Sequence, residues 1–72
     1  MARAAPRNER LRAARDRSKL SRPAVVLHMR KIGVQITADA VKKHEEGGSK
    51  PRRKTREAYA KVYKTPEDAL FG

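Results

Sequence analysis

The chain has 72 residues, and its 19 Lys and Arg against 8 Asp and Glu give a net charge of +11. A chain of this length forms at most one small domain, and because it contains no cysteine, disulfides and zinc-thiolate sites are excluded. The positive charge favours a polyanionic partner, either a nucleic acid or an anionic lipid surface.

Catalysis and membrane insertion are not expected. The sequence contains no paired-carboxylate pattern, no nucleophile near a histidine and no phosphate-binding glycine loop, so we predict no enzyme and no small-molecule ligand. His28 and His44 do not make a metal site by themselves, so no cofactor is expected. No apolar run reaches ten residues, which predicts an intracellular protein without a membrane span.

The N-terminal half predicts a basic arm and two helices. Residues 1–6 have no hydrophobic pattern and are expected to be a disordered arm. A first helix is predicted from Arg7 to about Arg17, with Leu11 and Ala14 inside. A second is predicted over 22–31, capped by Ser21, and its buried face is expected to include four residues: Val25, Val26, Met29 and Ile32.

The segment 37–46 predicts a short helix with a polar outer face. Thr37 can cap it, Asp39 opposes the positive end of its dipole, and Gly47 and Gly48 end it. Helical spacing places Val41 inside with Ala40 and His44. The outer face is then left with Ala38, Asp39, Lys42, Lys43 and Glu46 for solvent or a ligand.

The C-terminal part predicts two more helices. Thr55 is expected to cap a helix that ends near Tyr63, with Ala58, Tyr59 and Val62 inside. Thr65 and Pro66 are expected to start a fifth helix. After this core is assigned, one apolar group remains for a dimer contact: Tyr63, Leu70 and Phe71.

This pattern resembles the Cro and lambda-repressor-like helix-turn-helix family, also called the XRE family. The resemblance covers about residues 7–71 and rests on apolar, cap and glycine positions in the family's order: Leu11, Arg15, Leu20, Ser21, Val25, Val41, Glu45, Gly47, Pro51, Thr65, Pro66, Glu67, Leu70 and Phe71. It implies an all-α bundle of about five short helices, in which residues 7–72 form the DNA-binding domain. The turn between the second and third helices is about five residues longer than the family's commonest one.

The resemblance also implies roles for individual residues. Arg15 and Glu45 match a partly buried ion pair in relatives, and Arg22 matches a phosphate-contacting position, where backbone N–H groups also favour an anion. Lys50, Arg52 and Arg53 follow the third helix where the family again meets the backbone. Base readout is assigned to the third helix through Thr37, Ala38, Asp39, Lys42 and Lys43.

The distribution of charge agrees with this division of roles. Residues 1–31 carry ten basic and two acidic side chains, and residues 47–64 carry seven and one. Residues 32–46 between them carry two basic and three acidic side chains. Basic flanks can bind phosphates while a nearly neutral helix inspects bases.

We therefore expect a sequence-specific regulator that binds double-stranded DNA as a homodimer. A repressor or Cro-like protein of phage or mobile-element type, associated with the nucleoid in the cytoplasm of a bacterial host, fits this description. An antitoxin-type DNA-binding and protein-interaction module is the alternative, and it would use the surface of Tyr63, Leu70 and Phe71. A peptide that lies on a membrane surface is a further alternative, suggested by charge alone.

Overall fold

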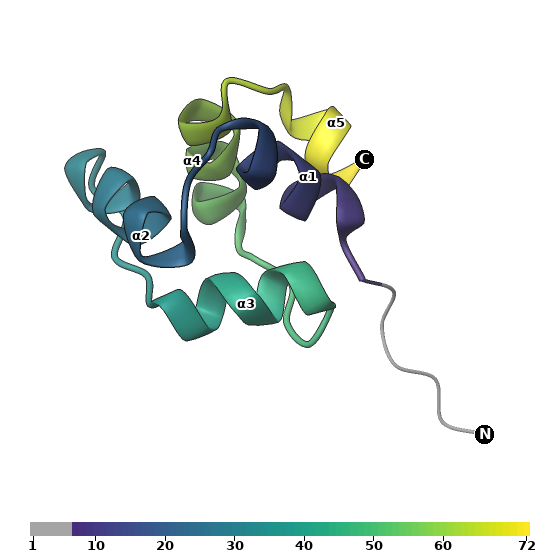
Figure 1. Ribbon diagram of the computed structural model, residues 1–72, viewed down its shortest axis with the longest axis horizontal. Coiled ribbons are helices and arrows are strands. Elements are labelled where there is room, and N and C mark those ends of the chain that lie inside the picture. Colours follow the sequence, from purple (N-terminus) through teal and green to yellow (C-terminus); the bar gives the residue numbers. More distant parts are fainter. Residues whose placement is uncertain (1–6) are drawn as a thin grey trace.

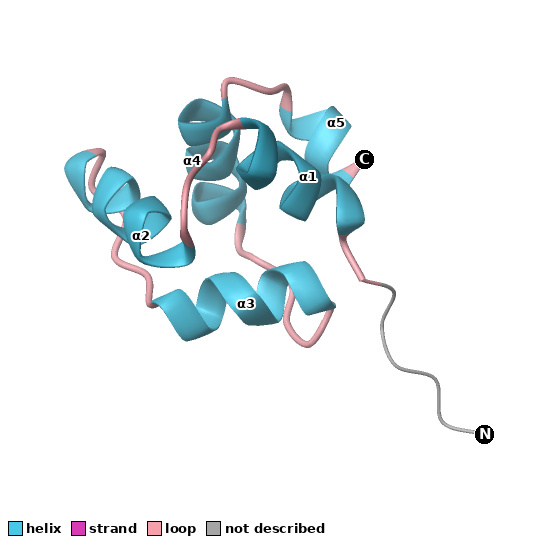
Figure 2. Cartoon of the chain, viewed as in Figure 1, coloured by secondary structure: helices cyan, strands magenta, loops and turns pink. Residues whose placement is uncertain are grey.

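The computed structural model describes residues 7–72, which form five α-helices and no strand (Figures 1 and 2). The helices are α1 (Glu9–Arg17), α2 (Arg22–Lys31), α3 (Ala38–Glu46), α4 (Arg53–Tyr63) and α5 (Glu67–Phe71). The prediction of a small all-α bundle with five short helices is confirmed. The expected basic arm, residues 1–6, lies outside the described part of the chain.

Polar side chains define the N-terminal ends of the first three helices. The side-chain oxygens of Asn8, Ser21 and Thr37 each accept a backbone N–H from the following turn, at 3.0, 3.2 and 3.1 Å. Ser21 and Thr37 were predicted as caps from the sequence. Asn8 was not, and it also donates to the backbone oxygen of Leu70 at 2.9 Å, which joins the start of α1 to α5.

The C-terminal ends of α1 to α4 share one backbone motif. In each, the residue after the turn donates its N–H to the carbonyl five positions earlier: Leu20 to Arg15, Val34 to Met29, Gly48 to Lys43 and Thr65 to Ala60. The residue before each of these donors has a positive φ: Lys19, Gly33, Gly47 and Lys64. This is the Schellman arrangement, in which glycine is the residue that avoids a steric penalty.

The described helices enclose one apolar core. Buried apolar residues come from every helix and from the α2–α3 connection: Leu11, Ala14, Val25, Met29, Val34, Val41, Ala58, Tyr59, Tyr63 and Leu70. Tyr59 is fully buried at its centre, stacked on Tyr63 with ring centroids 5.7 Å apart. Helix α3 lies along one edge of this bundle, with α1, α2 and α4 all on its inner side (Figure 1).

Two predictions about the core are wrong. Ile32 is 44% exposed, because α2 ends at Lys31 and the reversal at Gly33 brings Val34 into the core instead. Tyr63 and Leu70 are not a leftover apolar group, because they are 5% and 1% exposed inside the chain's own core.

Three predicted helix starts are also wrong. Helix α1 begins at Glu9 rather than at Arg7, because Asn8 caps it. The starts of α4 and α5 differ as well. Helix α4 begins at Arg53, and its N-cap is Arg52 without any side-chain hydrogen bond, so Thr55 lies within the helix rather than before it. The helix therefore begins three residues earlier than a Thr55 cap would allow, directly after Arg52 and the buried Pro51. In α5 the cap is Pro66, and the Thr65 hydroxyl donates back to the carbonyl of Tyr63 at 2.9 Å.

The lysine at the end of α4 provides a test of the shared motif. Lys64 has φ 52°, where a side chain costs about 1 kcal/mol that glycine avoids, partly offset by the larger chain entropy of glycine when unfolded. Lys64→Gly is expected to raise the free energy of unfolding by about 0.5 kcal/mol. Gly47→Ala, at φ 81°, should lower it by about 1 kcal/mol. Urea denaturation measures both, and a loss of stability in Lys64→Gly would contradict the argument.

Candidate nucleic-acid interface

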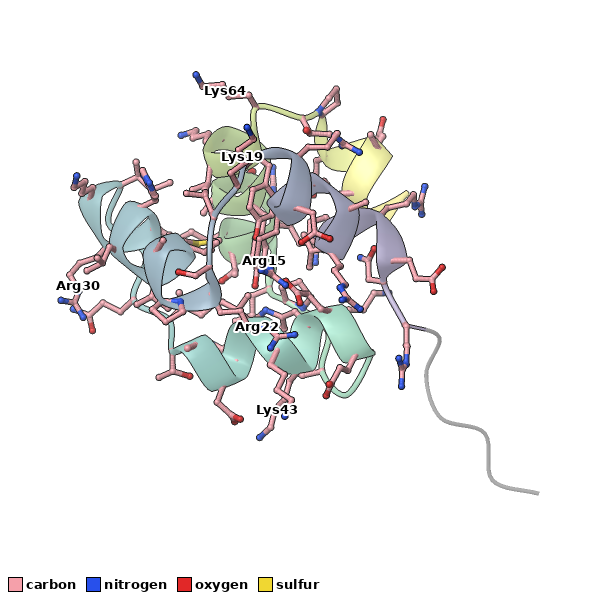
Figure 3. All side chains as sticks on the ribbon, viewed as in Figure 1. Arg15, Lys19, Arg22, Arg30, Lys43 and Lys64 are labelled. Atoms are coloured by element: carbon pink, nitrogen blue, oxygen red, sulfur yellow. The ribbon has the colours of Figure 1, made fainter. Side chains whose placement is uncertain are left out.

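The outer face of α3 is the surface that the sequence assigned to base readout. Thr37, Asp39, Lys42 and Lys43 are exposed, whereas Val41 and Glu45 point into the bundle and are buried. Lys43 extends away from the rest of the molecule (Figure 3). With nine residues at 1.5 Å each, α3 is about 14 Å long, a length that can lie in a major groove.

The charges on this face pair with each other. Lys43 Nζ lies 3.3 Å from Asp39 Oδ2, one helical turn away, and the two side chains are 61% and 69% exposed. An exposed pair of this kind is worth at most about 0.5 kcal/mol. Both groups therefore remain available to another partner at little energetic cost.

Behind this face, the predicted ion pair between Arg15 and Glu45 is present. Arg15 Nε donates to Glu45 Oε2 at 2.6 Å, and Nη2 donates to Oε1 at 3.3 Å. The third nitrogen, Nη1, donates to the carbonyl of Leu20 at 3.0 Å. The hydrogen bond to Glu45 is the main cause that raises the pKa of Arg15 above its ordinary value, while burial acts against it. The pair fixes α3 against α1.

Arg22, predicted to contact phosphate, is a third member of this cluster. Its Nε and Nη2 both donate to Glu45 Oε1, at 3.2 and 3.0 Å, and its side chain is 34% exposed. One buried carboxylate thus binds two guanidinium groups from α1 and α2. Sequence spacing could not predict this bond, because Arg22 and Glu45 are far apart in the chain.

The N-terminal end of α2 offers fewer free N–H groups than the sequence suggested. Pro23 has no N–H, while those of Ala24 and Val25 bind the side chain and backbone oxygens of Ser21. Of the backbone N–H groups that were expected to attract an anion beside Arg22, only that of Arg22 itself is therefore left. Any contact that Arg22 makes with an anion depends mainly on its side chain.

The basic segment after α3 leads directly into an uncapped helix. Lys50, Arg52 and Arg53, to which the resemblance assigns phosphate contacts, are all exposed. The first turn of α4 has no acidic side chain and no side-chain cap, so cations sit at the positive end of the dipole. Arg53 is partly compensated by Glu57, 3.3 Å away. An anion near this turn would relieve the unfavourable arrangement.

A hollow of about 440 Å³ lies between the start of α2 and the outer face of α3. It is lined by Arg15, Ser21, Arg22, Pro23, Ala38, Asp39 and Lys42. This concavity brings the predicted phosphate residue Arg22 next to the predicted readout residues of α3. Lys50, Arg52 and Arg53 do not line it.

His44 connects the inner side of α3 to the core. Its Nδ1 lies 2.7 Å from the Tyr59 hydroxyl, a bond that the sequence did not predict. Burial lowers the pKa of His44 below its ordinary 6.5, and burial also raises the pKa of Tyr59. A neutral imidazole can accept this bond from the hydroxyl.

Neither a metal site nor a membrane-spanning helix is found in the part of the chain that the structure describes. No group of three or more His, Asp or Glu within residues 7–72 could hold a metal ion. None of the described helices is long and apolar enough to cross a membrane.

Comparison of the chain with protein-family models, with curated proteins and with solved structures returned no match.

Substitutions in the Glu45 cluster should show unequal effects. Glu45→Ala leaves two arginines without their carboxylate, one of them nearly buried, and should cost about 3 kcal/mol of stability. Arg15→Ala should cost less, because Arg22 still binds Glu45. The double variant should lose less than the sum of the single losses. Thermal melts of the three variants measure this, and strictly additive losses would mean that the two residues do not interact.

His44 should make stability depend on pH. Because its folded pKa is lowered, its contribution is complete above the unfolded pKa of 6.5 and is lost as the pH falls through the folded value. Denaturation at about pH 7.5 and pH 5.5 should show a smaller loss on acidification in His44→Gln than in the unaltered protein. His28→Gln is the matched control, since His28 is exposed. An equal loss in all three proteins would contradict the assignment.

Proposed function

We propose that this protein is a sequence-specific double-stranded DNA-binding regulator that reads the major groove with α3. The observation that carries the proposal is the exposed outer face of α3 between two basic segments. Arg22 lies before this helix and Lys50, Arg52 and Arg53 follow it, while α3 itself is nearly charge-neutral at its surface. Such a surface can bind the backbone through its flanks and inspect bases through its centre.

Within this proposal, the first turns of α3 carry the readout. Asp39 can accept a hydrogen bond from a cytosine amino group, and Ala38 can contact a thymine methyl. Lys43, whose side chain is 61% exposed, can reach a base edge or a phosphate. The Asp39–Lys43 pair would exchange its weak mutual contact for contacts with DNA.

The proposed biological role is that of a repressor or Cro-like protein of phage or mobile-element type, which blocks a promoter by occupying it. Two copies on symmetric half-sites about 10 base pairs apart would supply more base contacts than one. The contact between copies cannot use Tyr63 or Leu70, because both are buried in the core. For the same reason, the antitoxin-type alternative loses most of the surface on which it depended.

Duplex binding as a function of salt tests the proposal. If each subunit neutralises roughly three to five phosphates, log K should fall with log salt by about 0.9 for each phosphate. Fluorescence anisotropy with a labelled random duplex measures this, and a flat salt response would exclude DNA as the partner. Selection of bound sequences from random duplexes then defines the operator.

Single substitutions distinguish readout from phosphate contact. Asp39→Ala and Lys43→Ala should change which sequences are preferred, whereas Arg52→Ala should weaken operator and random DNA alike. Lys64→Gly removes a charge from the opposite side of the molecule to Lys43 (Figure 3) and should change affinity least. If Asp39→Ala tightens binding to both DNAs equally, Asp39 is only a local helix charge and not a readout residue.

A further inference from the structure

Glu45 uses only one edge of the Arg22 guanidinium. A guanidinium has a side edge, formed by Nε–H and one N–H of Nη2, and an end edge, formed by Nη1 and the second N–H of Nη2. The bonds from Arg22 Nε and Nη2 to Glu45 Oε1, at 3.2 and 3.0 Å, occupy the side edge. No acceptor within residues 7–72 is bonded to Nη1 of Arg22. The end edge therefore remains available for a second oxyanion.

The two arginines of the cluster differ in this respect. Arg15 uses all three nitrogens inside the protein, two on Glu45 and one on the Leu20 carbonyl, and its side chain is only 13% exposed. Arg22 keeps its end edge and is 34% exposed. Arg15 alone already binds both oxygens of Glu45, so the carboxylate stays paired without Arg22. The cluster carries two positive charges and one negative, so one positive charge remains.

We infer that Glu45 is a positioning residue for DNA binding, which clamps Arg22 by its side edge so that the end edge is presented to a backbone phosphate. The inference rests on the proposed DNA-binding function and adds how the phosphate contact is made. Arg22 lines the hollow beside the outer face of α3, where a phosphate flanking the groove would lie. The clamp restricts the torsions of a long side chain before DNA arrives, so less conformational entropy is lost on binding.

Arg22→Lys distinguishes a guanidinium that Glu45 holds in place from a positive charge on an unrestrained side chain. Lysine keeps the charge, but its single ammonium cannot bind a carboxylate through one edge and a phosphate through another. This variant should weaken binding about 5- to 20-fold, as expected for the loss of a bidentate charge-assisted contact, while the salt slope stays within error. The Arg15–Glu45 pair is untouched, so the melting temperature should change little. Arg30→Lys, at the far end of α2 (Figure 3), is the matched control.

A second measurement tests, in the absence of DNA, whether Glu45 restricts the side chain of Arg22. In the free protein, the Nε–H signals of Arg15 and Arg22 in a proton–nitrogen correlation spectrum should both be sharp and slow to exchange, unlike that of Arg30. If Glu45→Gln folds, its Arg22 Nε–H signal should be broader than that of the unaltered protein. If it does not fold, the DNA-binding measurement on Arg22→Lys still tests the inference.

The outcomes separate this inference from the proposed function. If the unaltered protein shows no salt-dependent duplex binding, the proposed function fails, and with it the phosphate contact. If it binds DNA but Arg22→Lys binds as tightly as Arg30→Lys, or the Arg22 Nε–H exchanges as fast as that of Arg30, the clamp is overturned. Weaker binding by Arg22→Lys alone, with a slow Arg22 signal, supports it.

Discussion

The buried carboxylate of Glu45 is the constraint on which the arrangement of the first three helices depends. It is the one charged residue that is buried in the described part of the chain, and it receives hydrogen bonds from α1 and from α2. A carboxylate at 4% exposure is tolerable only when it is paired and hydrogen-bonded. Any shift of α3 relative to α1 or α2 would break these bonds, so the carboxylate specifies one placement for the exposed helix.

The remaining ion pairs act more locally. Arg56 donates to Glu67 at 3.1 Å and to the carbonyl of Pro51 at 2.9 Å, and this joins the start of α4 to both the preceding segment and α5. The basic segment before α4 is therefore attached to the bundle at Pro51, although its own cations are exposed.

The ends of the helices explain where the sequence was informative and where it was not. Gly33 and Gly47 have positive φ values of 87° and 81°, which the residue type itself favours, and Gly47 was predicted to end the third helix. Lys19 and Lys64 occupy the same place in the same motif with φ values of 56° and 52°, and nothing in their side chains indicates it. Their backbone is held by the packing of the residues that follow, such as the partly buried Leu20.

The sequence alone determined the number and order of the helices and most of their boundaries, because caps, glycines and apolar spacing act within one or two turns of the chain. Leu11, Ala14, Val25, Met29 and Val41 could be assigned to the core by helical spacing alone, and they are all buried. The Arg15–Glu45 pair came from a family resemblance rather than from spacing. Three features were decided only by tertiary structure: the burial of Tyr63 and Leu70, the His44–Tyr59 bond, and the capture of Arg22 by Glu45. Each joins helices whose relative placement is not encoded by local pattern, because it follows from how all five helices pack around Tyr59.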